Sequence, residues 1–240
     1  MKKNIKLGLL GLAAAVLFGA QIALGATLVQ VGDKIKFADG PGASPGGAFI
    51  LTDYGSAGTI AQGSFQSFCL EKNEYISYSP AVFNVSAISN EARAGGAGGQ
   101  ITTPYPHDPL DVRTAWLYTQ YIENPNALNA VTGWSALSVV DRGTAMQQAI
   151  WSIEQEIGGV TGVASALITA AGAAGWSDTG RVHVLNLTWW SGGGSSYPTG
   201  TFAQDQLYIT PVPEPEIYAM MGLGLGLMGF VARRRKQSAA

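Results

Sequence analysis

Two blocks of strand-like alternation flank a helical block, and this order is the strongest constraint on the fold. The alternating segments are residues 27–37, 48–54, 64–70, 81–88, 181–189 and 201–210. Helical periodicity instead covers residues 110–122 and 138–157, and a weaker Ala-rich segment covers 163–174. The order strands, helices, strands predicts an α+β fold, with a helical lobe inserted in a β-sandwich or a barrel-like lobe.

Glycine and proline residues mark the expected loops and helix ends. Gly40-Pro41-Gly42 and residues 44–47 are expected to form loops, and residues 95–99 a flexible break. Asp108-Pro109 is expected to cap the first helix. Gly158-Gly159 is expected to end the second helix, because glycine readily takes the left-handed conformation found there.

The N-terminus has the three parts of a secretory signal peptide. Three lysines precede an apolar run at residues 7–20, and Ala23 and Gly25 place small residues where a signal peptidase cuts. The run is shorter than the roughly 20 residues of a membrane-spanning helix. We therefore expect residues 1–26 to be a signal peptide that directs secretion through the Sec pathway.

The C-terminus carries a second apolar segment between two polar motifs. Pro213, Glu214 and Pro215 precede the hydrophobic segment 217–232, and Arg233, Arg234 and Arg235 follow it. Such basic residues stay on the cytoplasmic side of a membrane. From its length and glycine content, the segment is expected to be either a weak membrane anchor or a transient one that is processed away.

This three-part order closely resembles the PEP-CTERM sorting signal of Gram-negative, biofilm-forming bacteria, and the resemblance covers residues 211–240. It implies that an exosortase is the processing partner. It also implies a C-terminal hydrophobic transmembrane helix that holds the protein transiently in the inner membrane. The mature protein would then reach the outer surface or the extracellular matrix.

The residues between the two signals, 27–210, suit a single domain with strands at 27–90, a helical lobe at 108–175 and closing strands at 181–210. Only 12% of the residues are charged, which is typical of an extracellular β-rich protein rather than a cytosolic enzyme. A net charge of −2 gives no electrostatic support for nucleic-acid binding. One cysteine cannot form an internal disulfide, so packing alone must hold the fold.

The sequence gives no support for a cofactor, a metal site or enzymatic turnover. The glycine-rich residues 95–99 lack the following Lys-Ser/Thr of a phosphate-binding loop. His107 and His183 are far apart and have no acidic or cysteine neighbours at metal-ligand spacing. Glu154 and Glu156 are two residues apart on a helix and face different ways, so they are a poor catalytic pair for a polysaccharide hydrolase.

The remaining candidates for chemistry are the cysteine and a pair of adjacent glutamines. Cys69 lies in Phe68-Cys69-Leu70-Glu71, at the end of an expected strand. Gln147 and Gln148 lie in the second expected helix, in Met146-Gln147-Gln148-Ala149-Ile150-Trp151. Taken alone, such a cysteine is usually a small buried apolar residue, and such a glutamine is usually solvated.

Together these segments resemble the two signature motifs of bacterial thioester domains, which belong to cell-surface adhesins. The resemblance implies a thioester between the Cys69 sulfur and a glutamine side-chain carbonyl, used once to acylate an amine or hydroxyl on a partner. The early strand, the later helix and the closing strands extend it over most of the mature chain. The adhesins usually end in a cell-wall anchor, whereas this chain ends in a PEP-CTERM tail.

Helical periodicity selects the glutamine. The core-facing positions of the second helix form an apolar stripe, Met146, Ile150, Ile153 and Ile157. Gln147 borders this stripe, whereas Gln148 lies opposite to it and should meet water. We expect Phe68 and Trp151 to shield the bond, and Glu71 either to hydrogen-bond near it or to form a surface salt bridge.

The alternative is a non-reactive structural or carbohydrate-binding protein of the biofilm matrix. In this interpretation, Cys69 is simply buried and Gln147 is a hydrogen-bonding residue at the edge of the core. Exposed aromatic side chains near the C-terminal loops, Trp189, Trp190 and Tyr197, would then stack on sugars.

Overall fold

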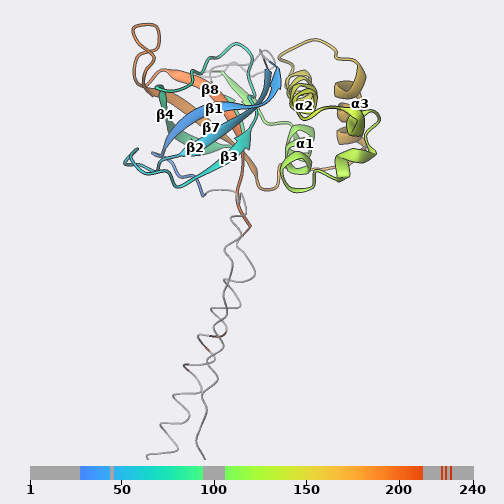
Figure 1. Ribbon diagram of the computed structural model, residues 1–240, viewed down its shortest axis with the longest axis horizontal. Helices are drawn as coiled ribbons and strands as arrows, with labels where there is room; N and C mark the ends of the chain where they lie inside the picture. The colour runs from blue at the N-terminus through green and yellow to red at the C-terminus, as the bar shows by residue number, and fades with distance from the viewer. Residues whose placement is uncertain are drawn as a thin grey trace, which may run out of the picture.

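The computed structural model describes residues 28–43, 46–93 and 106–212, together with Leu223, Leu225 and Met228. The strands are β1 (Lys34–Ala43), β2 (Gly46–Asp53), β3 (Gly63–Ser67), β4 (Val82–Ser89), β5 (Glu91–Arg93), β6 (His107–Pro109), β7 (Val182–Ser191) and β8 (Phe202–Ile209). The α-helices are α1 (Val112–Glu123), α2 (Val139–Ile153) and α3 (Gly162–Ala173), and the 3-10 helices are Ala127–Ala130 and Trp134–Ala136. Figure 1 shows the strands on one side of the molecule and the three α-helices on the other.

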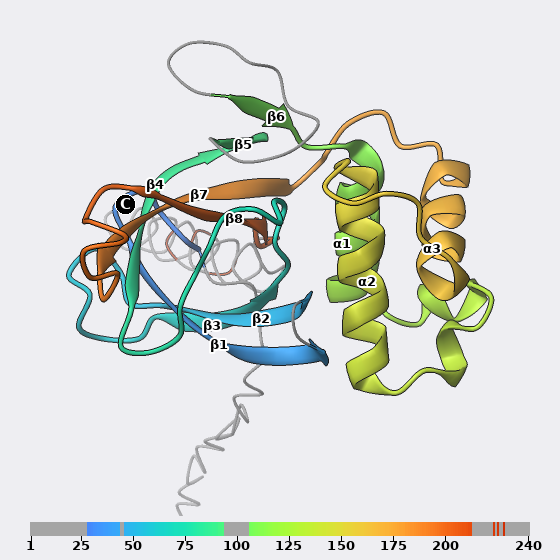
Figure 2. The same ribbon diagram turned by 90° about the horizontal axis from the view of Figure 1, so that it is seen from above.

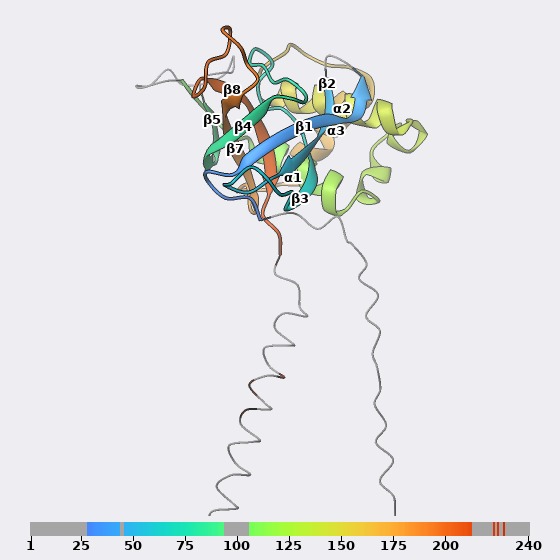
Figure 3. The ribbon, with the colours of Figure 1, turned by 60° about the vertical axis from the view of Figure 1, so that its left-hand side comes forward.

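Six strands form one antiparallel sheet in the order β3-β2-β1-β4-β7-β8, which lies in front of the helices in Figure 3. Its two outer strands are joined, because the chain directly after β3 pairs with β8 around a bridge between Cys69 and Gln206. The Leu207 N–H donates to the Phe68 carbonyl at 3.0 Å on one side of this bridge. The closed sheet surrounds an apolar core that includes Ile35, Phe37, Leu51, Phe83, Val85, Leu185 and Leu187.

The α-helices follow β6 and precede β7, and Figure 2 shows them packed at one end of the sheet. Side-chain caps start two of them: Asp111 accepts from the Arg113 N–H at 2.8 Å, and Ser138 accepts from the Asp141 N–H at 3.1 Å. A second apolar core lies between sheet and helices and includes Phe68, Leu117, Tyr118, Met146, Ile150 and Leu167. The predicted mixed class, with helices inserted between strands, is confirmed, and the β part is one large antiparallel sheet.

The first hairpin differs from the prediction. β1 begins at Lys34 rather than at residue 27, and it continues through Gly40-Pro41-Gly42, which was predicted to be a loop. The pairing register with β2 shifts between Asp39 and Gly42, and this irregularity accommodates the proline without ending the strand. Gly46 and Gly47, also expected in a loop, begin β2.

Two predicted helix ends are also wrong. Asp108-Pro109 does not cap α1 but forms β6 with its neighbour His107, and the cap is Asp111. α2 ends at Ile153 and not at the predicted Gly158-Gly159. Gln155 takes the left-handed conformation with φ 66°, and the Glu156 N–H donates to the Trp151 carbonyl at 2.8 Å. These features form a Schellman motif, which terminates the helix without glycine.

Several predictions lie outside the described residues: the signal peptide at 1–26, the break at 95–99, Pro213, Glu214 and Pro215, and the arginines at 233–235. Of the hydrophobic segment 217–232, the structure describes only Leu223, Leu225 and Met228, which are helical. Within the described part of the chain, no helix has the length and apolar character needed to cross a bilayer.

Candidate functional site

Gln147 on α2 and Cys69 after β3 are held together by two hydrogen bonds. The Gln147 Oε1 accepts from the Cys69 N–H at 3.1 Å, and the Gln147 Nε2 donates to the Cys69 carbonyl at 2.9 Å. Both residues are buried, with exposed fractions of 0% for Gln147 and 1% for Cys69. The adjacent Gln148 is exposed, as the helical periodicity predicts. The fold therefore places one carboxamide against the residue that carries the only thiol.

The β1–β2 hairpin covers this pair, and two glycines allow its close approach to α2. A Cβ atom on Gly143 would lie 1.9 Å from the Pro41 carbonyl oxygen. A Cβ atom on Gly46 would lie 3.0 Å from the Gln147 Cγ and 2.9 Å from the edge of the Trp151 ring. Since there is no room for a side chain at either position, the hairpin backbone itself shields Gln147 and Trp151 from solvent.

The Cys69 thiol is in its neutral form. Burial raises the pKa of this thiol far above its ordinary value, and the nearby Glu71 carboxyl raises it further. The Gln206 side chain lies beside the thiol and lowers the pKa of the thiol, by less than burial raises it. Gln206 is itself fully buried, and its Oε1 atom has no hydrogen-bond partner in the part of the chain that the structure describes. This residue therefore has an acceptor free to orient the S–H group.

Glu71 and Asp205 form a buried carboxyl pair next to the thiol. Asp205 accepts hydrogen bonds from the Asn186 Nδ2 at 2.7 Å, the Arg93 N–H at 2.8 Å and the Leu187 N–H at 2.9 Å. Glu71 accepts from the Asp205 N–H at 3.1 Å, and its Oε1 has no partner among the described residues. Burial raises the pKa of both groups, to about 7 for Asp205, and their mutual repulsion raises that of Glu71 further. Three donors stabilise the Asp205 anion, so Glu71 is the member of the pair whose charged form is less stabilised.

A surface cavity of about 410 Å³ opens beside Cys69. Its aromatic walls are Phe49, Tyr75, Tyr78 and Trp151, and its charged side chains are Lys72 and Glu74. Trp151 is only 5% exposed, and its Nε1–H has no acceptor in the described residues. The cavity thus gives a small molecule or a side chain a route from solvent to Cys69.

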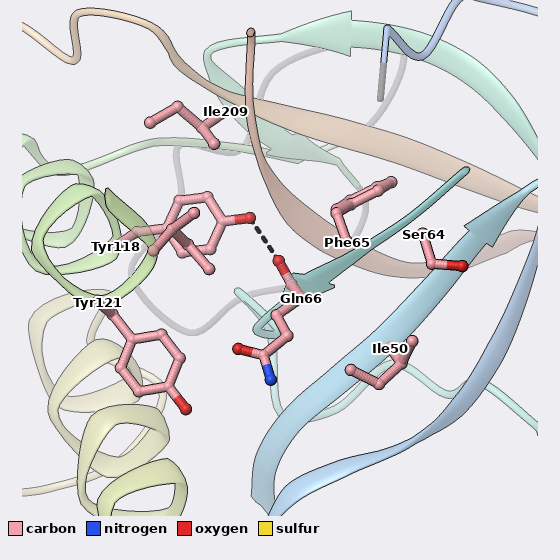
Figure 4. Close-up of a pocket in the computed structure, with 8 residues that line it drawn as sticks. Ile50, Ser64, Phe65, Gln66, Tyr118, Tyr121 and Ile209 are labelled. Carbon is pink, nitrogen blue, oxygen red and sulfur yellow. Dashed lines mark hydrogen bonds between the residues drawn. The ribbon is translucent and has the colours of Figure 1, made fainter. Parts of the chain in front are cut away.

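A second cavity, of about 260 Å³, lies between the sheet and α1 and is shown in Figure 4. Ile50, Phe65, Tyr121 and Ile209 give it a largely apolar wall. The Tyr118 hydroxyl at its edge donates to the Gln66 carbonyl at 2.7 Å. Cys69 and Gln147 do not border this cavity, so it is separate from the candidate site.

The other predicted site residues have different environments. Trp151 lines the cavity beside Cys69, as a shielding residue should. Phe68 instead packs in the core between sheet and helices, with its ring centroid 5.0 Å from that of Tyr121. Glu71 is 1% exposed, so the predicted alternative of a surface salt bridge is wrong. The second predicted alternative for Glu71 was a carboxyl that hydrogen-bonds near the thiol, and this is where the residue lies.

Sequence reasoning missed the contribution of β8. Gln204, Asp205 and Gln206 are consecutive, polar and buried, and they reach the site because the sheet closes between β8 and the Cys69 segment. Three polar residues in a strand whose neighbours are apolar were the available signal, since buried polar groups need specific partners. Of the tryptophans predicted to be exposed for stacking on sugars, Trp190 is 50% exposed, but Trp189 is 2% exposed, so the prediction for Trp189 is wrong.

Comparison with known proteins identifies one feature of the chain. Residues 211–236 match the family model described as the PEP-CTERM protein-sorting motif, which confirms the resemblance of the C-terminal segment to this signal. The match supports an exported protein that an exosortase processes at the cell envelope. No match was found among curated proteins or among solved structures.

The pH dependence of stability gives a first prediction. Burial raises the pKa of Glu154 to about 8 from an ordinary value of 4.5, and its Oε1 accepts from the Asp111 N–H at 3.3 Å. Because this pKa is raised in the folded state, the Glu154 carboxyl stabilises the fold fully below about pH 4.5. This contribution to stability is lost as the pH rises through about 8. We expect Glu154→Gln to remove on the order of 4 kcal/mol of the fall in unfolding free energy between pH 5 and pH 9.

Urea denaturation at the two pH values measures this difference between wild type and variant. A Gln148→Glu variant adds a carboxyl to the exposed face of the same helix and should keep the wild-type slope. Parallel pH curves for wild type and Glu154→Gln would contradict the assignment.

Proposed function

We propose that this exported protein is an adhesin of the cell surface or extracellular matrix that attaches covalently to a partner through a Cys69–Gln147 thioester. The observation that carries the proposal is the pair of hydrogen bonds, at 3.1 and 2.9 Å, between the Gln147 carboxamide and the Cys69 backbone. These bonds hold the carboxamide beside the backbone of the residue that carries the sulfur, and such positioning favours an otherwise unfavourable acyl transfer. The sorting motif at 211–236 supports the export of the protein to the surface or matrix.

Formation of the bond requires one exchange at the Gln147 side chain. The Cys69 sulfur attacks the Gln147 Cδ, the new C–S bond forms, and the C–N bond breaks. The thiol proton goes to the departing nitrogen, which leaves as ammonia. The buried Glu71 carboxyl lies next to the thiol and can relay the thiol proton. The burial of the site limits competition from water.

Attachment then consumes the bond. An amine or hydroxyl of the partner attacks the same acyl carbon, the C–S bond breaks, and the Cys69 thiol is regenerated. The partner remains joined to the Gln147 side chain by an amide or ester. Each molecule reacts once, so the proposed activity is a single acyl transfer and not enzymatic turnover.

Intact mass of the mature protein tests the proposal. We expect the wild-type mass to be lower than that of the sequence by one ammonia and to rise by one methylamine after treatment with that amine. Cys69→Ala should show neither change, because it lacks the attacking sulfur. A wild-type protein with the full sequence mass and a thiol that reacts with a thiol reagent after denaturation would contradict the proposal.

A further inference from the structure

Glu74 brings an acidic group to the cavity beside Cys69. It lies five residues after Cys69, and both residues line the cavity of about 410 Å³. Its Oε2 atom is buried and has no hydrogen-bond partner in the described part of the chain. The Trp151 Nε1–H, on the α2 side of the same cavity, is also buried and lacks an acceptor there. Buried polar atoms are rarely left unpaired in proteins, so the Glu74 oxygen indicates a ligand with a hydrogen-bond donor in the cavity.

The charged groups around Glu74 are predominantly negative. Asp205 faces it from β8, Glu156 faces it from the segment after α2, and Glu71 and Lys72 belong to its own segment. Burial, and then the charges of Asp205 and Glu156, raise the pKa of Glu74 to about 8. An excess of carboxyl groups beside aromatic rings favours a cationic ligand with an apolar stem, and a primary alkylammonium group has this chemistry.

We propose that Glu74 is the general base for attachment, and that the cavity selects primary alkylamines as nucleophiles. The proposal rests on the thioester function proposed above. The Glu74 carboxylate takes one proton from the bound ammonium group, and the freed amine nitrogen attacks the Gln147 acyl carbon. The C–N bond forms, the C–S bond breaks, and a second proton leaves the nitrogen for the Cys69 sulfur. The products are an amide, a neutral thiol and a protonated Glu74.

A base with this role should have a pKa near the working pH, because it must be ionised before the reaction and must still hold the proton afterwards. The environment of Glu74 meets this requirement, whereas the Glu71 carboxyl is buried outside the cavity lining and accepts from the Asp205 N–H at 3.1 Å. Glu74 is also the only carboxylate residue among the described residues that line the cavity. It is therefore the one acid that an incoming amine meets before it reaches Cys69.

The test measures methylamine incorporation by intact mass, between pH 6 and pH 9.5, in the mature wild-type protein and in Glu74→Gln. The wild type uses the ammonium form of methylamine, whereas Glu74→Gln depends on the free amine. We expect Glu74→Gln to retain the ammonia-deficient mass and to react at least about tenfold more slowly at pH 8.5. The wild-type rate should rise with pH and level off above about pH 8, the pKa of Glu74, whereas the Glu74→Gln rate should keep rising as free amine forms. Glu123→Gln, at the distant ion pair with Arg181, should keep the wild-type rate.

Two further outcomes decide the proposal. A Glu74→Gln protein that carries the thioester and reacts with the wild-type rate and pH profile would overturn the role of Glu74 but leave the thioester function intact. A wild-type protein with the full sequence mass would overturn both. If Glu74→Gln does not form the thioester, Glu156→Gln decides, since loss of that negative charge should move the wild-type inflection to lower pH. An unmoved inflection would then reject Glu74 as the base.

Discussion

A Gln147→Ala variant is expected to lose about 2 to 6 kcal/mol of unfolding free energy as well as all covalent attachment. The substitution leaves the Cys69 N–H and carbonyl buried without their partners at 3.1 and 2.9 Å. Each unsatisfied buried group costs about 1 to 3 kcal/mol. Urea denaturation measures the loss of stability, and intact mass after methylamine treatment measures the loss of attachment.

Gln148 provides the matched control on the next position of the same helix. It is exposed, so Gln148→Ala should change the unfolding free energy by no more than about 0.5 kcal/mol and should leave methylamine incorporation unchanged. Equal destabilisation by the two variants would show that the carboxamide of Gln147 does not hold the Cys69 segment in place.

The second large effect is expected at Gly143, where alanine should destabilise the protein by about 2 to 4 kcal/mol. Alanine is the better helix former, but its Cβ would lie 1.9 Å from the Pro41 carbonyl oxygen. The β1–β2 hairpin must therefore move away from α2. Because the same hairpin covers Gln147 and Trp151, we also expect faster hydrolysis of the proposed thioester, measured as a gain of water in intact mass.

Gly172 in α3 is the control for this substitution. A Cβ atom there would meet nothing within 4 Å, so Gly172→Ala should stabilise the protein by about 0.5 to 1 kcal/mol. The same chemical change is thus expected to have opposite signs in two helices of one protein. A stabilising effect at Gly143 would mean that the hairpin does not rest on α2 in solution.

Local periodicity accounts for the parts of the fold that were predicted correctly. The alternation at residues 81–88 and 201–210 and the 3.6-residue period at 110–122 report which faces are buried, and the structure places β4, β8 and α1 there. Gly40-Pro41-Gly42 misled because glycine and proline favour turns, whereas the long-range pairing with β2 keeps this segment in a strand. Gln155 gave no local sign that it would end α2 in a left-handed conformation.

The features of the candidate site were likewise predictable only where they depend on local sequence. The burial of Gln147 and the exposure of Gln148 follow from the phase of a single helix, so the sequence was sufficient to predict them. The approach of Asp205 and Gln206 to Cys69 depends on how a six-stranded sheet closes, and no local pattern contains that information. The raised pKa values of Glu71 and Glu74 arise from this closure and were equally invisible in the sequence.

The position of β8 has a mechanical consequence. Ile209 is the end of this strand, and the sorting motif begins at residue 211. Tension on the chain beyond that point pulls β8 along its own axis, at right angles to its hydrogen bonds with β7 and with the segment around Cys69. All of these hydrogen bonds are then loaded together in shear, instead of breaking one after another. In a molecule tethered at this end and bonded to a partner at Gln147, the force would pass through these β8 hydrogen bonds.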